Sequence, residues 1–131
     1  MSDETKKTHL STQEKAVRIA GWLHDKQAKD IVALDVAAVN PVCEAMIVAG
    51  AANVRQAKAL ADHVLKCCSE LGLPYLGMEG YALGQWVLLD LNDVMVHIFQ
   101  EDVRPFYNLE GLWSEGHPIP LPFAAATSRP A

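Results

Sequence analysis

The sequence predicts an α/β fold: a single domain with a mixed β-sheet packed by helices. Two observations point to this class. Stretches with apolar residues at helical spacing alternate with short, almost wholly apolar runs rich in Val, Ile and Leu. The chain has 131 residues, 50% of them hydrophobic, which suits one domain with a sizeable core. The predicted order of helix, two strands, helix, three strands and a terminal helix is typical of one mixed sheet with helices packed on it.

The first helix is predicted to begin after Ser11, because Ser11 and Glu14 have the spacing of a capping box. Residues 1–12 are polar and are expected to be a disordered tail. The helix should end before Lys29. Its buried face is predicted to contain Ala16, Ile19, Ala20 and Leu23.

Two nearly continuous apolar runs, residues 31–36 and 45–49, predict central strands. A longer helix should follow Asn53, which can cap its N-terminus, and end at Gly72. Its buried stripe is predicted to be Ala57, Leu60, Ala61, Val64, Cys68 and Leu71. Residues 75–79 predict a short strand.

Residues 86–99 predict a β-hairpin whose two faces differ in chemistry. A two-residue turn at Asn92-Asp93 sets its register. One face is then wholly apolar, with the pairs Leu91/Val94, Leu89/Val96 and Val87/Ile98. The other face has the pairs Trp86/Phe99, Leu88/His97 and Asp90/Met95. Because a sheet needs only one apolar face to be buried, we expect function on the second face.

The last part of the chain is predicted to contain little regular structure. Residues 101–113 predict one or two helical turns, broken near Pro105. Residues 115–131 are proline-rich without helical or strand periodicity, and are expected to be a disordered tail. The folded domain should therefore span residues 13–114.

Composition excludes several classes of function. The net charge of −5 argues against direct nucleic-acid readout, which needs a basic face, and leaves a basic protein surface as a plausible partner. No run approaches the roughly 20 apolar residues of a membrane span. Three cysteines, two of them adjacent, do not form a disulfide framework. We therefore expect a cytoplasmic protein without membrane contact.

Catalytic and metal sites find weak support. Glu79, Asp90 and His97 are the candidates for acid–base chemistry, but no nucleophile motif accompanies them. We favour the interpretation that His97 is a structural residue whose hydrogen bonds are satisfied on a half-buried sheet face. His63 and Cys67 have helical spacing suited to a shared metal, yet further ligands are missing. We predict no catalytic residue, no cofactor and no metal.

Aromatic residues near the hairpin predict a partner-binding surface instead. Phe106 and Trp113 are expected to be core residues, whereas Trp86 and Tyr107 can be either core residues or interface anchors. Arg104 precedes Tyr107 by one helical turn. The predicted partner-binding residues are Trp86, Asp90, His97, Arg104 and Tyr107.

A series of short motifs occurs in a specific order: DIVALDV at 30–36, ADHV at 61–64, Glu79-Gly80, Trp86 to Asp90, DVMVHIF at 93–99 and Arg104-x-x-Tyr107-x-Leu109-Glu110-x-Leu112-Trp113. Together, over about residues 13–114, they resemble the ribosomal silencing factor family, also called Iojap-like or RsfS. The resemblance implies a domain related to the nucleotidyltransferase fold. It also implies a repressor that binds the large ribosomal subunit at its fourteenth protein, blocks joining of the small subunit and lowers translation when nutrients are limiting. A homodimer in the free state is consistent with this family.

One departure from the family pattern concerns the turn Gly50-Ala51-Ala52, which lacks the hydroxyl residues that family members often have there. The Gly-Ser turn and paired acids of a nucleotidyltransferase are missing too, so we expect a fold relative without the catalytic motif. Two alternatives remain: an assembly factor of the large subunit, and a nucleotidyltransferase-like enzyme.

Overall fold

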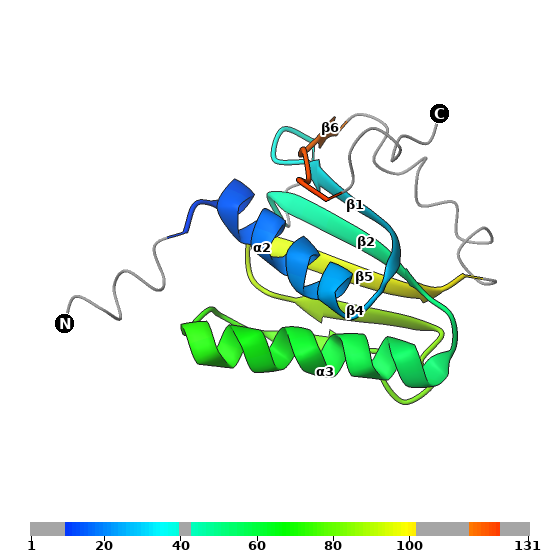
Figure 1. Ribbon diagram of the computed structural model, residues 1–131. Helices are drawn as coiled ribbons and strands as arrows, with labels where there is room; N and C mark the ends of the chain where they lie inside the picture. Colours follow the sequence, from blue (N-terminus) through cyan, green and yellow to red (C-terminus); the bar gives the residue numbers. More distant parts are fainter. Residues whose placement is uncertain (1–9, 40–42, 102–115, 124–131) are drawn as a thin grey trace.

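In the computed structural model, the described residues form a six-stranded mixed sheet with two helices packed on one face (Figure 1). The structure describes residues 10–39, 43–101 and 116–123. The helices are α2, Thr12–Asp25, and α3, Val54–Leu71. The strands are β1, Lys29–Asp35; β2, Ala45–Ala51; β3, Gly77–Glu79; β4, Trp86–Asp90; β5, Val94–Gln100; and β6, His117–Pro118. The predicted single-domain α/β fold is confirmed.

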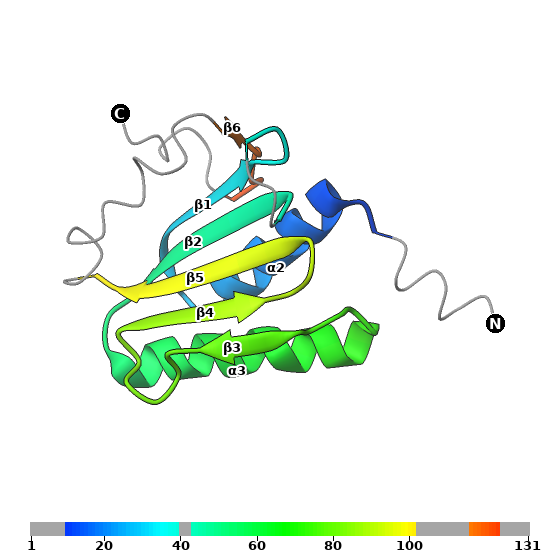
Figure 2. The ribbon, with the colours of Figure 1, turned by 180° about the vertical axis from the view of Figure 1, so that it is seen from behind.

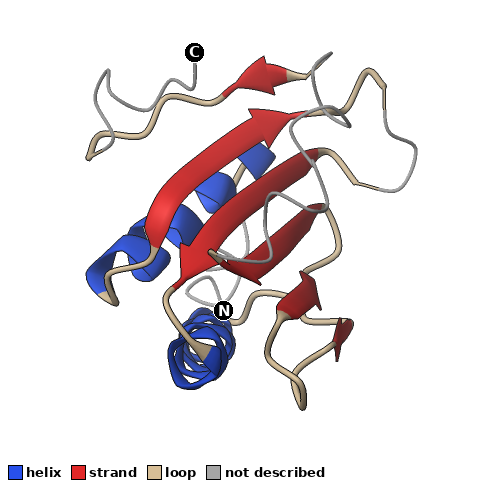
Figure 3. Cartoon of the chain, turned by 90° about the vertical axis from the view of Figure 1, so that its right-hand side faces the viewer, coloured by secondary structure: helices blue, strands red, loops and turns tan. Residues whose placement is uncertain are grey.

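The sheet order is β3-β4-β5-β2-β1-β6. β2 and β5 are parallel and lie in the middle, while every other neighbouring pair is antiparallel. Both helices lie on the same side of this sheet (Figure 3). The run predicted at residues 45–49 is therefore a central strand, β2, as its continuous hydrophobicity predicts. The run predicted at residues 31–36 is β1, which lies between β2 and the two-residue strand β6.

The helix ends follow the predicted capping chemistry. The Ser11 hydroxyl accepts from the Glu14 amide, and the Ser11 amide donates to the Glu14 carboxylate, which completes the capping box. Asn53 caps α3 by accepting from the Gln56 amide at 2.8 Å. Gly72 ends α3 in the left-handed conformation, with φ of 71°.

The two faces of the sheet carry separate apolar clusters. Alternate residues of the strands pack beneath α2 and α3, including Ile47, Leu89, Val96 and Ile98. We call the opposite side the open face, because no described helix covers it (Figure 2). Its buried residues are Leu34, Val36, Cys43, Val48 and Phe99, with Val32, Met46, Trp86 and Met95 half-buried around them.

The predicted hairpin register is confirmed. Trp86 lies opposite Phe99, Leu88 opposite His97 and Asp90 opposite Met95. At the turn, the Leu91 amide donates to the Val94 carbonyl, and Asn92 adopts a φ of 82°. Asn tolerates this left-handed conformation better than most residues, which explains why the turn forms here.

The expectation of a disordered tail from residue 115 is wrong for residues 117–123. β6 pairs with β1, and the amide of Ile119 donates to the Ala33 carbonyl. Ile119 and Leu121 are buried in the core, whereas the prolines that alternate with them, Pro118, Pro120 and Pro122, are exposed. Proline is tolerated at a sheet edge because its missing N–H faces outward there. The alternation of buried apolar residues with exposed prolines matches neither a helical pattern nor an uninterrupted strand pattern, so the sequence does not predict this strand.

Other predicted bounds differ slightly. β1 begins at Lys29 rather than residue 31, and β3 spans fewer residues than 75–79. The N-terminal tail predicted for residues 1–12 is too long, because Leu10 packs against the core and Thr12 begins α2. The helical turns predicted for 101–113 fall almost wholly outside the described residues. No helix in the described part of the chain is long and apolar enough to cross a membrane.

Candidate functional site

The candidate site is the part of the open face formed by β4 and β5 with the neighbouring β2. Strand alternation directs Trp86, Leu88 and Asp90 of β4, and Met95, His97 and Phe99 of β5, to this side. Trp86, Leu88, Asp90 and Met95 are half-buried, while His97 and Phe99 are buried. The face therefore combines accessible apolar surface with a small number of polar groups.

Three rings on this face form a stack toward the end of the hairpin that lies away from its turn. The Trp86 ring lies 4.9 Å from Phe99 and 6.0 Å from His97, measured between centroids. The His97 and Phe99 rings are nearly parallel, at 4°. The Trp86 indole N–H donates to Nδ1 of His97 at 3.2 Å. The stack places the polar edge of Trp86 against His97 and so fixes both side chains.

His97 is buried without a charged partner. Its side chain is 8% exposed, and burial lowers its pKa to about 4. Desolvation is the sole cause of this shift, because removing an imidazolium from water is unfavourable unless an anion compensates it. His97 is therefore neutral at physiological pH.

The acid–base interpretation of Glu79, Asp90 and His97 does not gain support from this geometry. Asp90 accepts from the Asn92 amide at 3.0 Å and so belongs to the hairpin turn. Glu79 is exposed at the sheet edge, opposite Leu88. Neither carboxylate contributes to the pKa of His97, so the three groups form no tuned acid–base set.

Gly80 has a steric role beside this site. Its φ is 82°, and a Cβ placed there would lie 2.0 Å from the carbonyl oxygen of Trp86. Any other residue would push β4 away at its first position. The Glu79-Gly80 motif is thus a backbone requirement for the position of Trp86.

The turn between β2 and α3 is closed by the chain itself. The Ala52 amide donates to the side-chain oxygen of Gln56 at 2.7 Å, and Asn53 caps the helix. The side-chain amide of Gln56 in turn donates to the carbonyls of Lys26 and Gln27. The Ala52 amide therefore has an internal partner and is not free to donate to a phosphate at this helix N-terminus.

The His63 and Cys67 pair on α3 is a local contact. Cys67 Sγ lies 3.7 Å from His63 Nε2, and burial raises the pKa of the thiol. No group of three metal-binding side chains occurs among the described residues. Within the part of the chain that the structure describes, the pair therefore has no third ligand, whereas a protein metal site usually has three or four.

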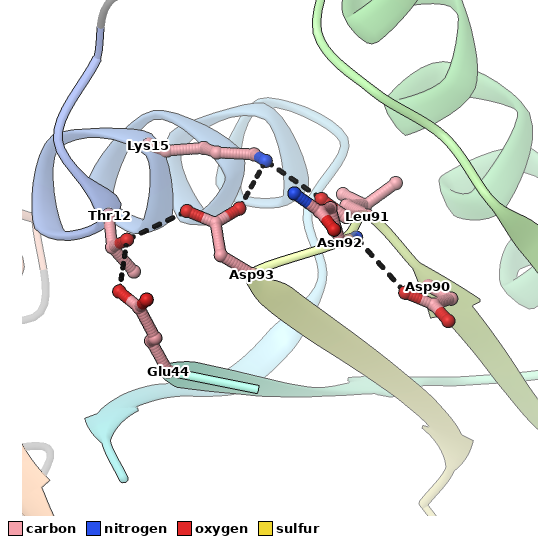
Figure 4. A network of polar contacts seen from close by, with 7 residues as sticks. All are labelled: Thr12, Lys15, Glu44, Asp90, Leu91, Asn92 and Asp93. Carbon is pink, nitrogen blue, oxygen red and sulfur yellow. Dashed lines mark hydrogen bonds and ion pairs between the residues drawn. The ribbon is translucent and has the colours of Figure 1, made fainter. Parts of the chain in front are cut away.

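A network around the buried amine of Lys15, which we did not predict from the sequence, fixes the turn of the hairpin (Figure 4). Lys15 of α2 is only 3% exposed, and its Nζ contacts Asp93 Oδ1 at 2.5 Å and the Leu91 carbonyl at 2.8 Å. Thr12 donates to the carboxylates of Asp93 or Glu44, each at 2.7 Å. Lys15 lies four residues before Ile19 in the apolar stripe, and this spacing was the signal that could have revealed it.

Of the predicted partner-binding residues, the structure brings Trp86 and His97 into contact and places Asp90 at the end of the same face. Arg104 and Tyr107 lie outside the described residues, as do Phe106 and Trp113.

Comparison with known proteins gives consistent matches over most of the chain. The family described as "Ribosomal silencing factor during starvation" matches residues 9–131. A ribosomal silencing factor from Halalkalibacterium halodurans is 33% identical over 112 residues, covering 86% of this chain and 96% of the relative. A crystal structure of a Chromobacterium violaceum protein has a TM-score of 0.75 at 35% identity, covering 90% of this chain and 98% of that one.

A more distant relative is the mouse protein named mitochondrial assembly of ribosomal large subunit protein 1. It is 22% identical over 112 residues, which cover 81% of this chain and 48% of that protein. The family match and the relatives at or above 30% identity agree with the motifs of the hairpin and with the fold. The chain belongs to the ribosomal silencing factor family.

Proposed function

We propose that this protein represses translation by docking the open face on the large ribosomal subunit, at its fourteenth protein. The small subunit is then prevented from joining, and translation falls when nutrients are limiting. The family membership supports a ribosome-associated silencing role. The site at the fourteenth protein follows from the resemblance described above.

The observation that carries the location is the composition of the open face. Trp86, Leu88 and Met95 are half-buried there, on the side opposite the described helices. Aromatic and methionine side chains with accessible apolar surface are enriched at protein interfaces. The net charge of −5 is complementary to a basic protein surface.

Sedimentation with separated ribosomal particles tests the proposal. We expect the protein to co-sediment with free large subunits and not with small subunits or joined ribosomes. The purified fourteenth protein of the large subunit should bind it directly. Equal recovery with joined ribosomes would contradict the blocking mechanism, and retention by large subunits that lack the fourteenth protein would contradict the proposed contact.

A role in assembly of the large subunit is a second candidate. The name of the mouse relative, an assembly protein of the mitochondrial ribosomal large subunit, favours it. Binding to precursor particles in preference to mature large subunits is the outcome that would favour assembly over silencing.

We also propose that the protein acts without catalysis, in the cytoplasm. Gln56 takes an amide of the turn that follows β2, and no metal-binding cluster occurs within the described ranges. Nucleoside triphosphate turnover that depends on a divalent metal and is abolished by Asp90→Asn would contradict this.

The free protein is proposed to form a homodimer through the apolar open face. Light scattering should then give twice the monomer mass, and addition of the ribosomal partner should dissociate the pair. A monomer at all accessible concentrations would contradict this arrangement.

A further inference from the structure

Two polar side chains are buried among the described residues, Lys15 and His97, and they differ in how they are satisfied. The Lys15 amine has both a carboxylate and a carbonyl partner. His97 has a partner at Nδ1, but its Nε2 is buried without a hydrogen-bond partner in the described part of the chain. Buried polar atoms are nearly always paired, so this nitrogen requires an explanation.

Trp86 determines which nitrogen of His97 carries the proton. An indole N–H is a donor only, so Nδ1 of His97 must accept from it. A neutral imidazole then carries its proton on Nε2. Burial keeps the ring neutral, as the lowered pKa indicates. His97 consequently offers a donor on the open face and no acceptor.

We propose that Nε2–H of His97 donates to a neutral carbonyl oxygen of the protein on which the open face docks. The inference rests on the proposed function, because it names the partner group at the proposed contact. A lysine or arginine side chain cannot occupy this position, since both have donors only. The pair of Trp86 and His97 therefore selects an acceptor over a cationic donor at this position.

Charge favours a neutral acceptor over an anion. Asp90 lies on the same face, one residue pair along the hairpin from His97, and the whole chain has a net charge of −5. A carboxylate or phosphate would be repelled by these charges and would lose its hydration in a buried position. A neutral carbonyl oxygen is not repelled by these charges, and it costs less to remove from water than an anion does.

An acceptor reaches Nε2 of His97 only when the side chains around it move. Nε2 is not in contact with solvent, so the acceptor must enter as the partner packs on the face. Met95 is two residues along β5, and Met46 lies opposite Met95 on β2; both are half-buried. Methionine side chains rearrange easily, and they are common where a surface adapts to a partner.

The first test is the tautomer of His97 in the free protein. Nitrogen-15 NMR of the histidine side chains should show His97 with a protonated Nε2 and an unprotonated Nδ1, and His97→Gln identifies its signals. Trp86→Phe keeps a ring in the stack but removes the indole donor, so this preference should weaken. A proton on Nδ1 in the wild-type protein would overturn the inference without reference to any ribosome.

The second test is binding to purified large subunits. His97→Met removes the donor and should weaken binding about ten-fold, whereas His97→Gln places an amide N–H near the same position and should lose about three-fold or less. Melting temperatures of both variants show that they are folded. Wild-type binding by His97→Met would overturn the inference.

Leu88→Lys separates this inference from the proposed function, because it places a charge on the open face next to His97. If Leu88→Lys loses binding while His97→Met retains it, the face is the docking surface but the His97 donor is not used. If both variants bind at full strength, the docking surface lies elsewhere, and the proposed location fails together with the inference.

Discussion

The two faces of the sheet are built from the same strands but hold their apolar residues in different ways. Beneath α2 and α3, the side chains of Leu89, Val96 and Ile98 have no solvent exposure. On the open face, Trp86, Leu88 and Met95 keep part of their surface accessible around the buried ring of His97. Alternation along one hairpin thus separates residues that stabilise the fold from residues that can recognise a partner.

The largest effect should come from the helix-covered face. Leu89→Ala is expected to lower the free energy of unfolding by about 3 to 4 kcal/mol, because it leaves a cavity among fully buried neighbours. Leu88→Ala, the adjacent residue on the open face, is the matched control and should lose less than about 2 kcal/mol, because part of its surface is already hydrated. Urea unfolding measures both. Equal losses would show that the two faces do not differ as described.

The pH dependence of stability should report the buried His97. In the unfolded chain this residue titrates at its ordinary pKa of 6.5, and in the folded chain at about 4. Between these values the unfolded state takes up a proton that the folded state does not. The contribution of His97 to the free energy of unfolding is therefore fully present above pH 6.5, and it is lost as the pH is lowered toward 4. The loss from this group is at most about 3 kcal/mol.

His97→Gln isolates the contribution of His97. The lowered pKa of His63 also makes stability depend on pH, but this effect is present in both proteins and cancels in their difference. The difference between wild type and variant should decline through this pH range and level off below it. A difference that does not change with pH would place His97 in a hydrated environment, which contradicts its burial.

A smaller effect is expected at the buried network of Figure 4. Asp93→Asn leaves the Lys15 ammonium without its counterion and should cost about 2 kcal/mol, less than a fully buried pair because the Asp93 side chain is 24% exposed. Glu70→Gln is the matched control: it breaks the exposed pair of Lys66 and Glu70 and should change stability by less than about 0.5 kcal/mol. If both variants changed the free energy of unfolding by similarly small amounts, the Lys15 ammonium would be hydrated when Asp93 is replaced, which contradicts its burial.

The hairpin and the helices could be predicted from the sequence because their signals are local. The turn at Asn92-Asp93 and the alternation around it determine the register, and Ser11 and Asn53 mark the helix starts by their capping chemistry. The Trp86 and His97 contact follows from that register, although its hydrogen bond does not.

Features that depend on distant contacts could not be predicted. The spacing of Lys15 in the apolar stripe of α2 indicates that it faces the core, but its partner Asp93, 78 residues later in the chain, is brought to it only by the fold. β6 has a proline-rich sequence that predicts a loop, and only its pairing with β1 makes it a strand. Similarly, the parallel pairing of β2 with β5 depends on the connection through α3, β3 and β4.

The most direct test of the open face as the docking surface is one pair of identical substitutions. Leu88→Lys places a charge in the middle of the open face, and Leu83→Lys places it in the loop between β3 and β4, where Leu83 is 74% exposed. Binding to purified large subunits is measured for both, with melting temperature as the check on folding. We expect Leu88→Lys to weaken binding at least about ten-fold and Leu83→Lys to bind as the wild type does. Full binding by a folded Leu88→Lys variant would contradict the open face as the docking surface.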